Sequence, residues 1–262
     1  MFKTRLLSGI ILMVITITLV VIGGNLLFTT TAIISVIGMA ELNRSVKKHL
    51  TLPAILGYCA GLTYYLLLYF NNSQYYTTFF ILFLMVLMVV YVFTFPKYKI
   101  EDITIVYFGL FYVSIMLSYI YQVRMLEDGS LLVWLIFIGA WGSDTCAYCT
   151  GMLFGKHKLT PKLSPKKTVE GSIGGVVGAA LIGFIYASFF KDSITDISNP
   201  QLAFAIIGGA SSIIAQIGDF AASAVKRNHD IKDYGNLIPG HGGILDRFDS
   251  IIFTAPSPLF FK

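Results

Sequence analysis

Hydrophobic positions in this chain are gathered into long, nearly uninterrupted runs separated by short polar segments. A helix that rises about 1.5 Å per residue needs roughly 20 mostly apolar residues to cross a hydrocarbon core about 30 Å thick. By that measure the pattern predicts nine membrane-spanning helices, at 6–22, 25–42, 51–70, 75–95, 103–123, 130–154, 172–190, 201–225 and 244–262. The pattern therefore favours an all-α, polytopic integral membrane protein.

Composition agrees with this fold class. Hydrophobic residues make up 56% of the 262 positions and charged residues only 13%, and the mean hydropathy is +0.75. Soluble globular proteins carry about 25% charged residues, so an ordinary soluble enzyme and a disordered chain are both excluded. Three cysteines in apolar stretches fit no disulfide framework. The net charge of +5 reflects loop lysines beside a lipid bilayer rather than a nucleic-acid partner.

The distribution of basic residues predicts the orientation. With the N-terminus in the cytoplasm, nearly all loop lysines and arginines fall on the cytoplasmic side, and the opposite loops receive only Arg124 and Lys191. Such an excess of cytoplasmic Lys and Arg is the usual signature of membrane topology. We therefore expect nine spans with a cytoplasmic N-terminus.

The chain reads as a single membrane domain over 1–262. Its first part, 1–125, consists mostly of structural spans with short loops, whereas the polar residues that need an explanation lie in 130–249. The two longest polar segments, 155–171 and 226–243, are both expected to be cytoplasmic loops. Any chemistry is expected in this second part.

Four aspartates stand inside or at the ends of late spans: Asp144, Asp219, Asp246 and Asp249. A charged side chain at the bilayer centre costs a few kcal/mol even on lenient scales, so it is normally paired or functional. Each aspartate could simply pair with a lysine and fix helix packing. Several of them together, toward the cytoplasmic ends of their helices, favour a functional site.

Helical spacing brings acidic and basic groups together. Asp219, Ser223, Lys226 and Arg227 share one face of the eighth helix, because they are separated by four, seven and eight residues. Converging carboxylates suit a hard cation such as Mg²⁺, and neighbouring basic groups suit phosphates. Glu41, which ends the second span, either caps that helix or faces the site.

Both polar segments carry signals for anion binding. The glycines between Gly235 and Gly243 free the backbone for close approach of its N–H groups to an anion, although a flexible, solvated loop would have the same composition. Lys166, Lys167 and Thr168 directly precede the seventh helix, where a phosphate could bind near the helix N-terminus. As the alternative, the lysine pair is a commonplace feature of a cytoplasmic loop.

The same residues form a recognisable pattern. The stretch from Ser223 to Asp249, with its KR, KD and IPGHGGIxDRFD elements, resembles the C-terminal signature of the phosphatidate cytidylyltransferases, also called CDP-diacylglycerol synthases. The SPKKTVEG stretch and the Trp-x-x-Asp-x-x-Ala-Tyr stretch from Trp141 to Tyr148 are similar to further motifs of that family. Together the motifs cover about residues 139–249, and the earlier spans match only as generic membrane helices.

This resemblance implies a reaction in which CTP and phosphatidic acid give CDP-diacylglycerol and pyrophosphate with Mg²⁺, at a site facing the cytoplasm of a bacterial inner membrane. It implies metal ligands at Asp219 and Asp246, with Asp249 and Asp144 nearby. Catalytic roles fall to Asp219, Lys226, Arg227, Asp246 and Arg247. Substrate-binding roles fall to Lys166, Lys167, Thr168, Ser223, Lys232, His241, Gly242 and Gly243. A homodimer is compatible with the family.

Two other classes are consistent with parts of the pattern. An ion-coupled transporter would also place carboxylates in membrane helices, but it should show them in broken or repeated helices, and we find no internal repeat. A lipid kinase or an archaeal ether-lipid cytidylyltransferase would share the architecture. Substrate assays would separate these possibilities.

Overall fold

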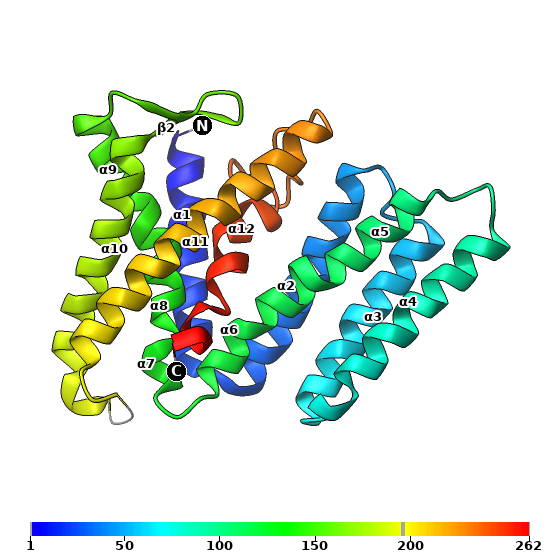
Figure 1. Cartoon of the computed structure of the whole chain (residues 1–262), viewed down its shortest axis with the longest axis horizontal. Coiled ribbons are helices and arrows are strands. Elements are labelled where there is room, and N and C mark those ends of the chain that lie inside the picture. Colours follow the sequence, from blue (N-terminus) through cyan, green and yellow to red (C-terminus); the bar gives the residue numbers. More distant parts are fainter. Residues whose placement is uncertain (1, 195–196, 262) are drawn as a thin grey trace.

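The computed structural model describes residues 2–194 and 197–261, with side chains from residue 6 to residue 260. Two groups of helices make up the chain, and its first helix lies among the helices of the second half (Figure 1). The first half contains α1 (Phe2–Ile22), α2 (Gly24–Ser45), α3 (Leu52–Tyr69), α4 (Tyr76–Phe93), α5 (Ile100–Gly109) and α6 (Met116–Arg124). The second half contains α7 (Gly129–Leu132), α8 (Trp134–Phe137), α9 (Ser143–Phe154), α10 (Val169–Phe190), α11 (Pro200–Asn228) and α12 (Leu245–Thr254).

Long apolar helices confirm the expected class of all-α integral membrane protein. Within the described residues, seven helical segments are long and apolar enough to cross a membrane, and Leu6–Ile22 of α1 forms a shorter apolar helix. The observed bounds of α3, α4 and α10 fall within three residues of the expected spans. The total of nine spans stays a prediction.

Two of the spans contain wider helical turns. A π-helical segment, Leu110–Ile115, joins α5 to α6, and a second one, Ile138–Gly142, joins α8 to α9. Such insertions interrupt the regular hydrogen-bond ladder and are frequent at functional sites. The second segment ends two residues before Asp144, so one of these irregular turns lies directly beside a predicted site residue.

The expected last span, 244–262, is not one continuous helix. Only Leu245–Thr254 is α-helical, and the chain continues as the 3₁₀ segment Ser257–Phe261. Ten helical residues rise only about 15 Å, which is half of a hydrocarbon core. Pro256 and Pro258 account for the break, because proline lacks the N–H group that a continuing helix needs.

The expected loop 155–171 contains a β-hairpin, which is a small departure from an all-α fold. Strand β1 (Lys158–Thr160) pairs antiparallel with β2 (Ser164–Thr168), and Lys158 lies opposite Thr168. Glu170 stabilises the base of the hairpin, because the Glu170 carboxylate accepts hydrogen bonds from the backbone N–H groups of Lys156 and His157. The hairpin is therefore a defined element that ends at the start of α10.

Helices α9, α10 and α11 pack closely through small residues. A Cβ atom on Gly174 or Gly178 of α10 would collide with Thr150 or Cys146 of α9. On the other side, a Cβ atom on Gly183 would collide with the backbone of Phe204 in α11. This is the small-residue packing that lets membrane helices approach one another.

Side-chain caps fix where these helices begin. Thr168 Oγ1 accepts a hydrogen bond from Gly171 N at 3.1 Å at the start of α10. Asn199 does the same for Leu202 N at 3.3 Å at the start of α11, where Pro200 occupies the first helical position. Each cap satisfies one of the N–H groups that a helix terminus leaves unpaired.

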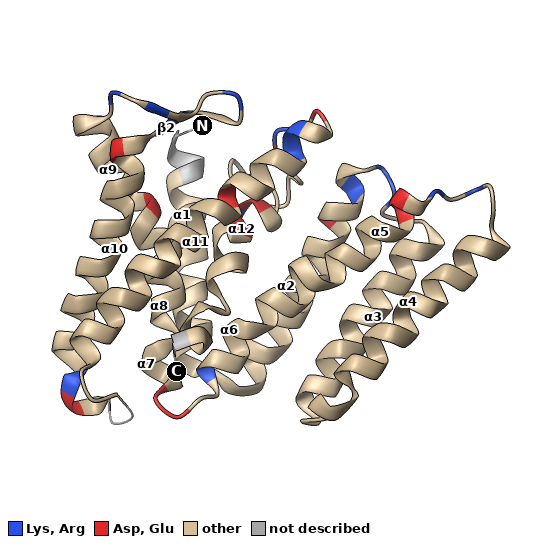
Figure 2. Ribbon diagram, in the orientation of Figure 1, with Lys and Arg blue, Asp and Glu red and all other residues tan. Residues whose placement is uncertain are grey.

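Charged residues gather at the two ends of the bundle, and most lysines and arginines lie at the end that carries the β-hairpin and the start of α12 (Figure 2). This is the distribution that the positive-inside rule expects of one cytoplasmic face. The side of the membrane on which that face lies stays a prediction.

Cysteine labelling tests this orientation. In a variant without Cys59, Cys146 and Cys149, we expect single cysteines at Lys162 and Asn236 to react with an impermeant reagent from the cytoplasmic side only. A cysteine at Ser198 should react from the opposite side only. Labelling of the first two positions from opposite sides would contradict the arrangement of helices between them.

Candidate functional site

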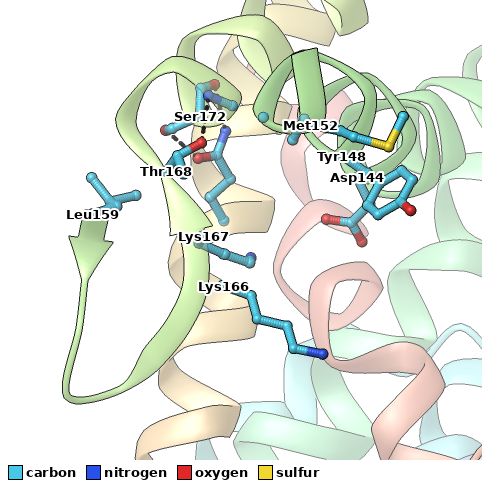
Figure 3. A pocket seen from close by; sticks show the side chains of 12 residues that line it. Asp144, Tyr148, Met152, Leu159, Lys166, Lys167, Thr168 and Ser172 are labelled. Carbon is cyan, nitrogen blue, oxygen red and sulfur yellow. Dashed lines mark hydrogen bonds between the residues drawn. The ribbon is translucent and has the colours of Figure 1, made fainter. Parts of the chain in front are cut away.

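Three neighbouring cavities lie at the end of the bundle that carries the hairpin. The first, called the lysine cavity, has a volume of about 310 Å³ and lies between α9, β2, α10 and α11 (Figure 3). Its walls include Asp144, Tyr148 and Met152 from α9, Lys166 and Lys167 from β2, and Gln216 from α11. In Figure 3 both lysine side chains extend away from the strand, and that of Lys167 points toward the side on which Asp144 lies. Basic groups and an apolar wall thus face the same space.

Two further cavities continue from the first. The aspartate cavity, of about 180 Å³, is lined by residues of α1 and by Trp141, Asp144, His241, Asp246, Arg247, Asp249 and Ser250. The loop cavity, of about 570 Å³, lies within the Gly-rich segment and is lined by Lys232, Asn236, His241, Gly242 and Arg247, among others. Asp144 borders the first two cavities, and His241 and Arg247 border the last two. The three cavities therefore form a row.

An ion pair joins the hairpin to α11. Lys167 Nζ lies 2.5 Å from Asp219 Oδ2, and it also lies 4.7 Å from the centroid of the Phe220 ring. The side chains of both ions are partly exposed, at 30% for Lys167 and 24% for Asp219. Because solvent reaches both groups, a ligand can reach them as well. A predicted site residue of the polar segment 155–171 is thus brought together with one inside α11.

A second ion pair joins α11 to α12 and is buried. Lys226 Nζ lies 2.9 Å from Asp246 Oδ1, and the Asp246 side chain is only 1% exposed. The other carboxylate oxygen accepts hydrogen bonds from Tyr234 N at 2.8 Å and from Gly243 N at 3.0 Å. Removing one partner of a buried pair costs about 3–5 kcal/mol, so this contact fixes the Gly-rich loop against two helices.

Glu41 of α2 holds the start of α12. Its carboxylate oxygens accept hydrogen bonds from Ile244 N at 3.0 Å and from Leu245 N at 2.8 Å, and the residue is 5% exposed. A Cβ atom on Gly235 or Gly243 would collide with this carboxylate. Glu41 therefore caps a helix two hundred positions away, and the two glycines make room for it.

The first helix reaches the same loop. Ser8 Oγ lies 2.8 Å from His241 Nδ1 and donates to the Pro239 carbonyl oxygen at 3.0 Å. The loop turns tightly here, since Gly240 and Gly242 have φ values of 76° and 88° that other residues rarely adopt. The contact places the His241 ring between the aspartate cavity and the loop cavity.

Beneath the lysine cavity, a polar network links three helices. Ser172 Oγ donates to Gln216 Oε1, and Gln216 Nε2 donates to Ser212 Oγ at 3.3 Å. The Ser212 hydroxyl in turn lies 2.6 Å from the Ser143 hydroxyl. Sequence reasoning missed this network, because serine and glutamine are common in membrane helices and have no charge that demands a partner.

Carboxylates from three helices are close enough to influence one another electrostatically in and beside the aspartate cavity. Asp144 has Lys167, Asp219 and Arg247 as its charged neighbours, and Asp249 has Asp219, Lys226 and Arg247. Even so, no three His, Cys, Asp or Glu residues within 2–194 and 197–261 are close enough together to enclose a metal ion. The oxygen-rich donor set matches the chemistry that Mg²⁺ requires, with few protein ligands and room for phosphate oxygens.

The predicted residues differ in how they meet the cavities. Arg247 borders two of them, whereas Arg227 is exposed at the end of α11 and donates to the Ile231 carbonyl oxygen at 3.3 Å. Five predicted site residues are absent from the walls of the three cavities in the part of the chain that the structure describes: Asp219, Ser223, Lys226, Arg227 and Gly243. Thr168 borders the lysine cavity while capping α10.

Cavities with aspartates and basic groups at one end of a membrane bundle are the arrangement of a membrane-embedded site for phosphate chemistry. The profile of the Cytidylyltransferase family matches residues 3–261, and the chain belongs to this family. It is 34% identical over 257 residues to the phosphatidate cytidylyltransferase of Staphylococcus haemolyticus, covering 97% of this chain and 96% of that protein. It is 32% identical over 262 residues to the phosphatidate cytidylyltransferase of Bacillus subtilis, covering 97% and 95%.

Glu41 provides a test of how the site is held. The substitution Glu41→Gln turns one acceptor oxygen into an NH₂ group that faces a backbone N–H, so we expect a lower midpoint of thermal unfolding in detergent. A buried N–H group left unsatisfied costs about 1–3 kcal/mol. We also expect cytidylyltransferase turnover to fall about tenfold or more, because Arg247 and Asp249 lie on the helix that Glu41 caps.

Asp102→Asn is the matched control. Asp102 caps α5 by accepting from Lys99 N at 3.0 Å, and it pairs with Lys48, away from the cavities. We expect this variant to lose a similar amount of stability and to keep its turnover under conditions where both variants are folded. Full turnover of folded Glu41→Gln would contradict the positioning role.

Proposed function

We propose that the chain catalyses the reaction in which CTP and phosphatidic acid give CDP-diacylglycerol and pyrophosphate. The observation that carries this proposal is the match to the Cytidylyltransferase family over nearly the whole chain, with relatives named phosphatidate cytidylyltransferase in several bacteria. The cavities support it, because they place phosphate-binding groups beside membrane helices. A lipid kinase, an ether-lipid enzyme and a transporter find no support among these relatives.

The chemistry matches the groups present. A phosphate oxygen of the lipid attacks the α-phosphorus of CTP, a new P–O bond forms, and the bond to the β-phosphate breaks to release pyrophosphate. The attacking oxygen is already ionised near neutral pH, so the site needs no strong general base. Its task is to align two anions and to offset their charge, which is work for cations in a pre-organised site. Among the described residues, the lysines and arginines that border the cavities are Lys166, Lys167, Lys232 and Arg247.

Mg²⁺ is the proposed cofactor, and Asp144, Asp219 and Asp249 are the proposed source of its few protein ligands. Phosphate oxygens would complete the set, because no three acidic residues among those described are close enough together to enclose the ion by themselves. When bound, the ion would offset charge on the phosphates. Asp246 belongs to the same predicted set, but both of its oxygens are engaged by Lys226 and by backbone N–H groups. We therefore assign Asp246 and Lys226 to holding the loop, and the three other aspartates to the metal.

The remaining predicted residues keep proposed roles in substrate binding. Lys232, His241 and Gly242 border the loop cavity, and Thr168 borders the lysine cavity. For Ser223, Arg227 and Gly243 the cavities provide no support, and their roles stay predictions. We place the site at the cytoplasmic face of a bacterial inner membrane, since CTP is supplied from the cytoplasm, and a homodimer stays a prediction.

An activity assay with the purified protein tests the function and its metal. With labelled CTP, phosphatidic acid and Mg²⁺ in detergent micelles, we expect CDP-diacylglycerol and pyrophosphate in equal amounts, and EDTA should abolish both. Asp219→Asn should lower turnover about 100-fold or more, because it removes a charge from the reacting centre. It should also abolish any increase in the thermal unfolding midpoint that Mg²⁺ produces in the wild type.

Asp192→Asn is the control, because Asp192 is exposed beyond α10, away from the three cavities. This variant should behave like the wild type in both measurements. Formation of a different lipid product would contradict the proposed reaction. Full activity of Asp219→Asn in the presence of Mg²⁺ would contradict only the metal assignment.

A further inference from the structure

The three cavities differ in the chemical nature of their walls. Tyr148 and Met152 border the lysine cavity, and they are 70% and 66% exposed on α9, within a segment long and apolar enough to span a membrane. In a bilayer, apolar side chains exposed on such a helix contact acyl chains. The lysine cavity therefore has one wall that continues onto the lipid-facing surface.

Opposite this apolar wall stand basic groups. Lys167 is held by Asp219, while Lys166 makes no ion pair with any carboxylate in the described parts of the chain. Figure 3 shows the Lys166 side chain extending away from the hairpin strand, below Lys167 in this view. An unpaired ammonium group beside an apolar surface suits a ligand with a phosphate at one end and hydrocarbon at the other.

The loop cavity has the opposite character. Its walls come from the segment 232–247, and Ile238 is the one aliphatic side chain among the residues that border it. The others are glycines and polar or charged residues, including Lys232, Asn236 and Arg247. With about 570 Å³ it is also the largest of the three, within the range of pockets that hold a whole small molecule. Such a cavity suits a polar, highly charged ligand that arrives from water.

Between the two lies the aspartate cavity. It shares Asp144 with the lysine cavity and Arg247 with the loop cavity. Its volume of about 180 Å³ is too small for either whole substrate, and it is bordered by two of the proposed metal ligands, Asp144 and Asp249. It can therefore hold only the reacting groups of ligands that enter from either side.

We propose that the lysine cavity binds the phosphate head group of the lipid substrate, with Lys166 as its contact, and that the loop cavity binds the nucleotide. The two phosphates then meet in the aspartate cavity. This assignment rests on the proposed function, and it adds which substrate each basic group serves. The bond changes are those given above: the lipid phosphate oxygen joins the α-phosphorus, and pyrophosphate leaves on the side of the loop cavity.

The reverse assignment is the alternative that an experiment must exclude. It would place the nucleotide against Lys166 and bring the lipid in beside α1, where Leu12 and Met13 border the aspartate cavity. The exposed wall of α9 and the polar lining of the loop cavity both argue against it. The two assignments predict opposite effects of the same substitutions.

Kinetics with each substrate varied separately distinguish them. We expect Lys166→Ala to raise the KM for phosphatidic acid about tenfold or more and to leave the KM for CTP unchanged, because one charge-assisted hydrogen bond is lost. Lys232→Ala should raise the KM for CTP and spare that for phosphatidic acid. Lys162→Ala is the matched control, because Lys162 lies in the same hairpin as Lys166 but borders none of the three cavities among the described residues.

Direct binding gives a readout that does not depend on turnover. Calorimetry with a short-chain phosphatidic acid and, separately, with CTP should show that Lys166→Ala loses affinity for the lipid only and Lys232→Ala for the nucleotide only. Effects on the opposite ligands, on both ligands equally or on neither would overturn the assignment. If the two variants show these selective losses of affinity but the wild-type protein forms no CDP-diacylglycerol, the proposed function is contradicted and the assignment of the cavities is not.

Discussion

Two carboxylates at the N-terminus of α12 are the constraint on which the rest of the site depends. Glu41 accepts from the N–H groups of Ile244 and Leu245, and Asp246 accepts from those of Tyr234 and Gly243. A buried N–H group without a partner is costly, and the N-terminus of a helix favours negative charge. These contacts anchor α12, which is too short to span a membrane.

The same contacts limit which groups of the Gly-rich loop can bind a ligand. Several of its N–H groups are used within the protein, and the side chain of Lys226 is held by Asp246. Burial also raises the pKa of the Tyr234 hydroxyl, which donates to the Ala222 carbonyl oxygen at 3.1 Å. The side chains that remain toward the loop cavity, among them Lys232, His241 and Arg247, are the groups that can meet a substrate.

Two ion pairs balance part of the charge of the site. Asp219 has Lys167 and Asp246 has Lys226, and each pair connects two elements that are distant in sequence. The two pairs differ in accessibility, because the first is partly exposed and the second is buried. A buried pair is suited to holding structure, and an accessible pair can exchange partners when phosphates or a metal ion arrive. We therefore place the buried Lys226–Asp246 pair in the framework of the site and the accessible Lys167–Asp219 pair in its reacting part.

The sequence by itself determined the membrane helices, because about 20 apolar residues in a row admit no other backbone in a bilayer. It also marked the aspartates and lysines, since charge in such a chain demands a partner or a role. Only the tertiary structure decided which partner each one has. Spacing placed Asp219 and Lys226 on one helix face, yet they bind lysine and aspartate from different elements, and Glu41 caps a helix far from its own. Contacts of that range depend on helix packing, which no local pattern of residues encodes.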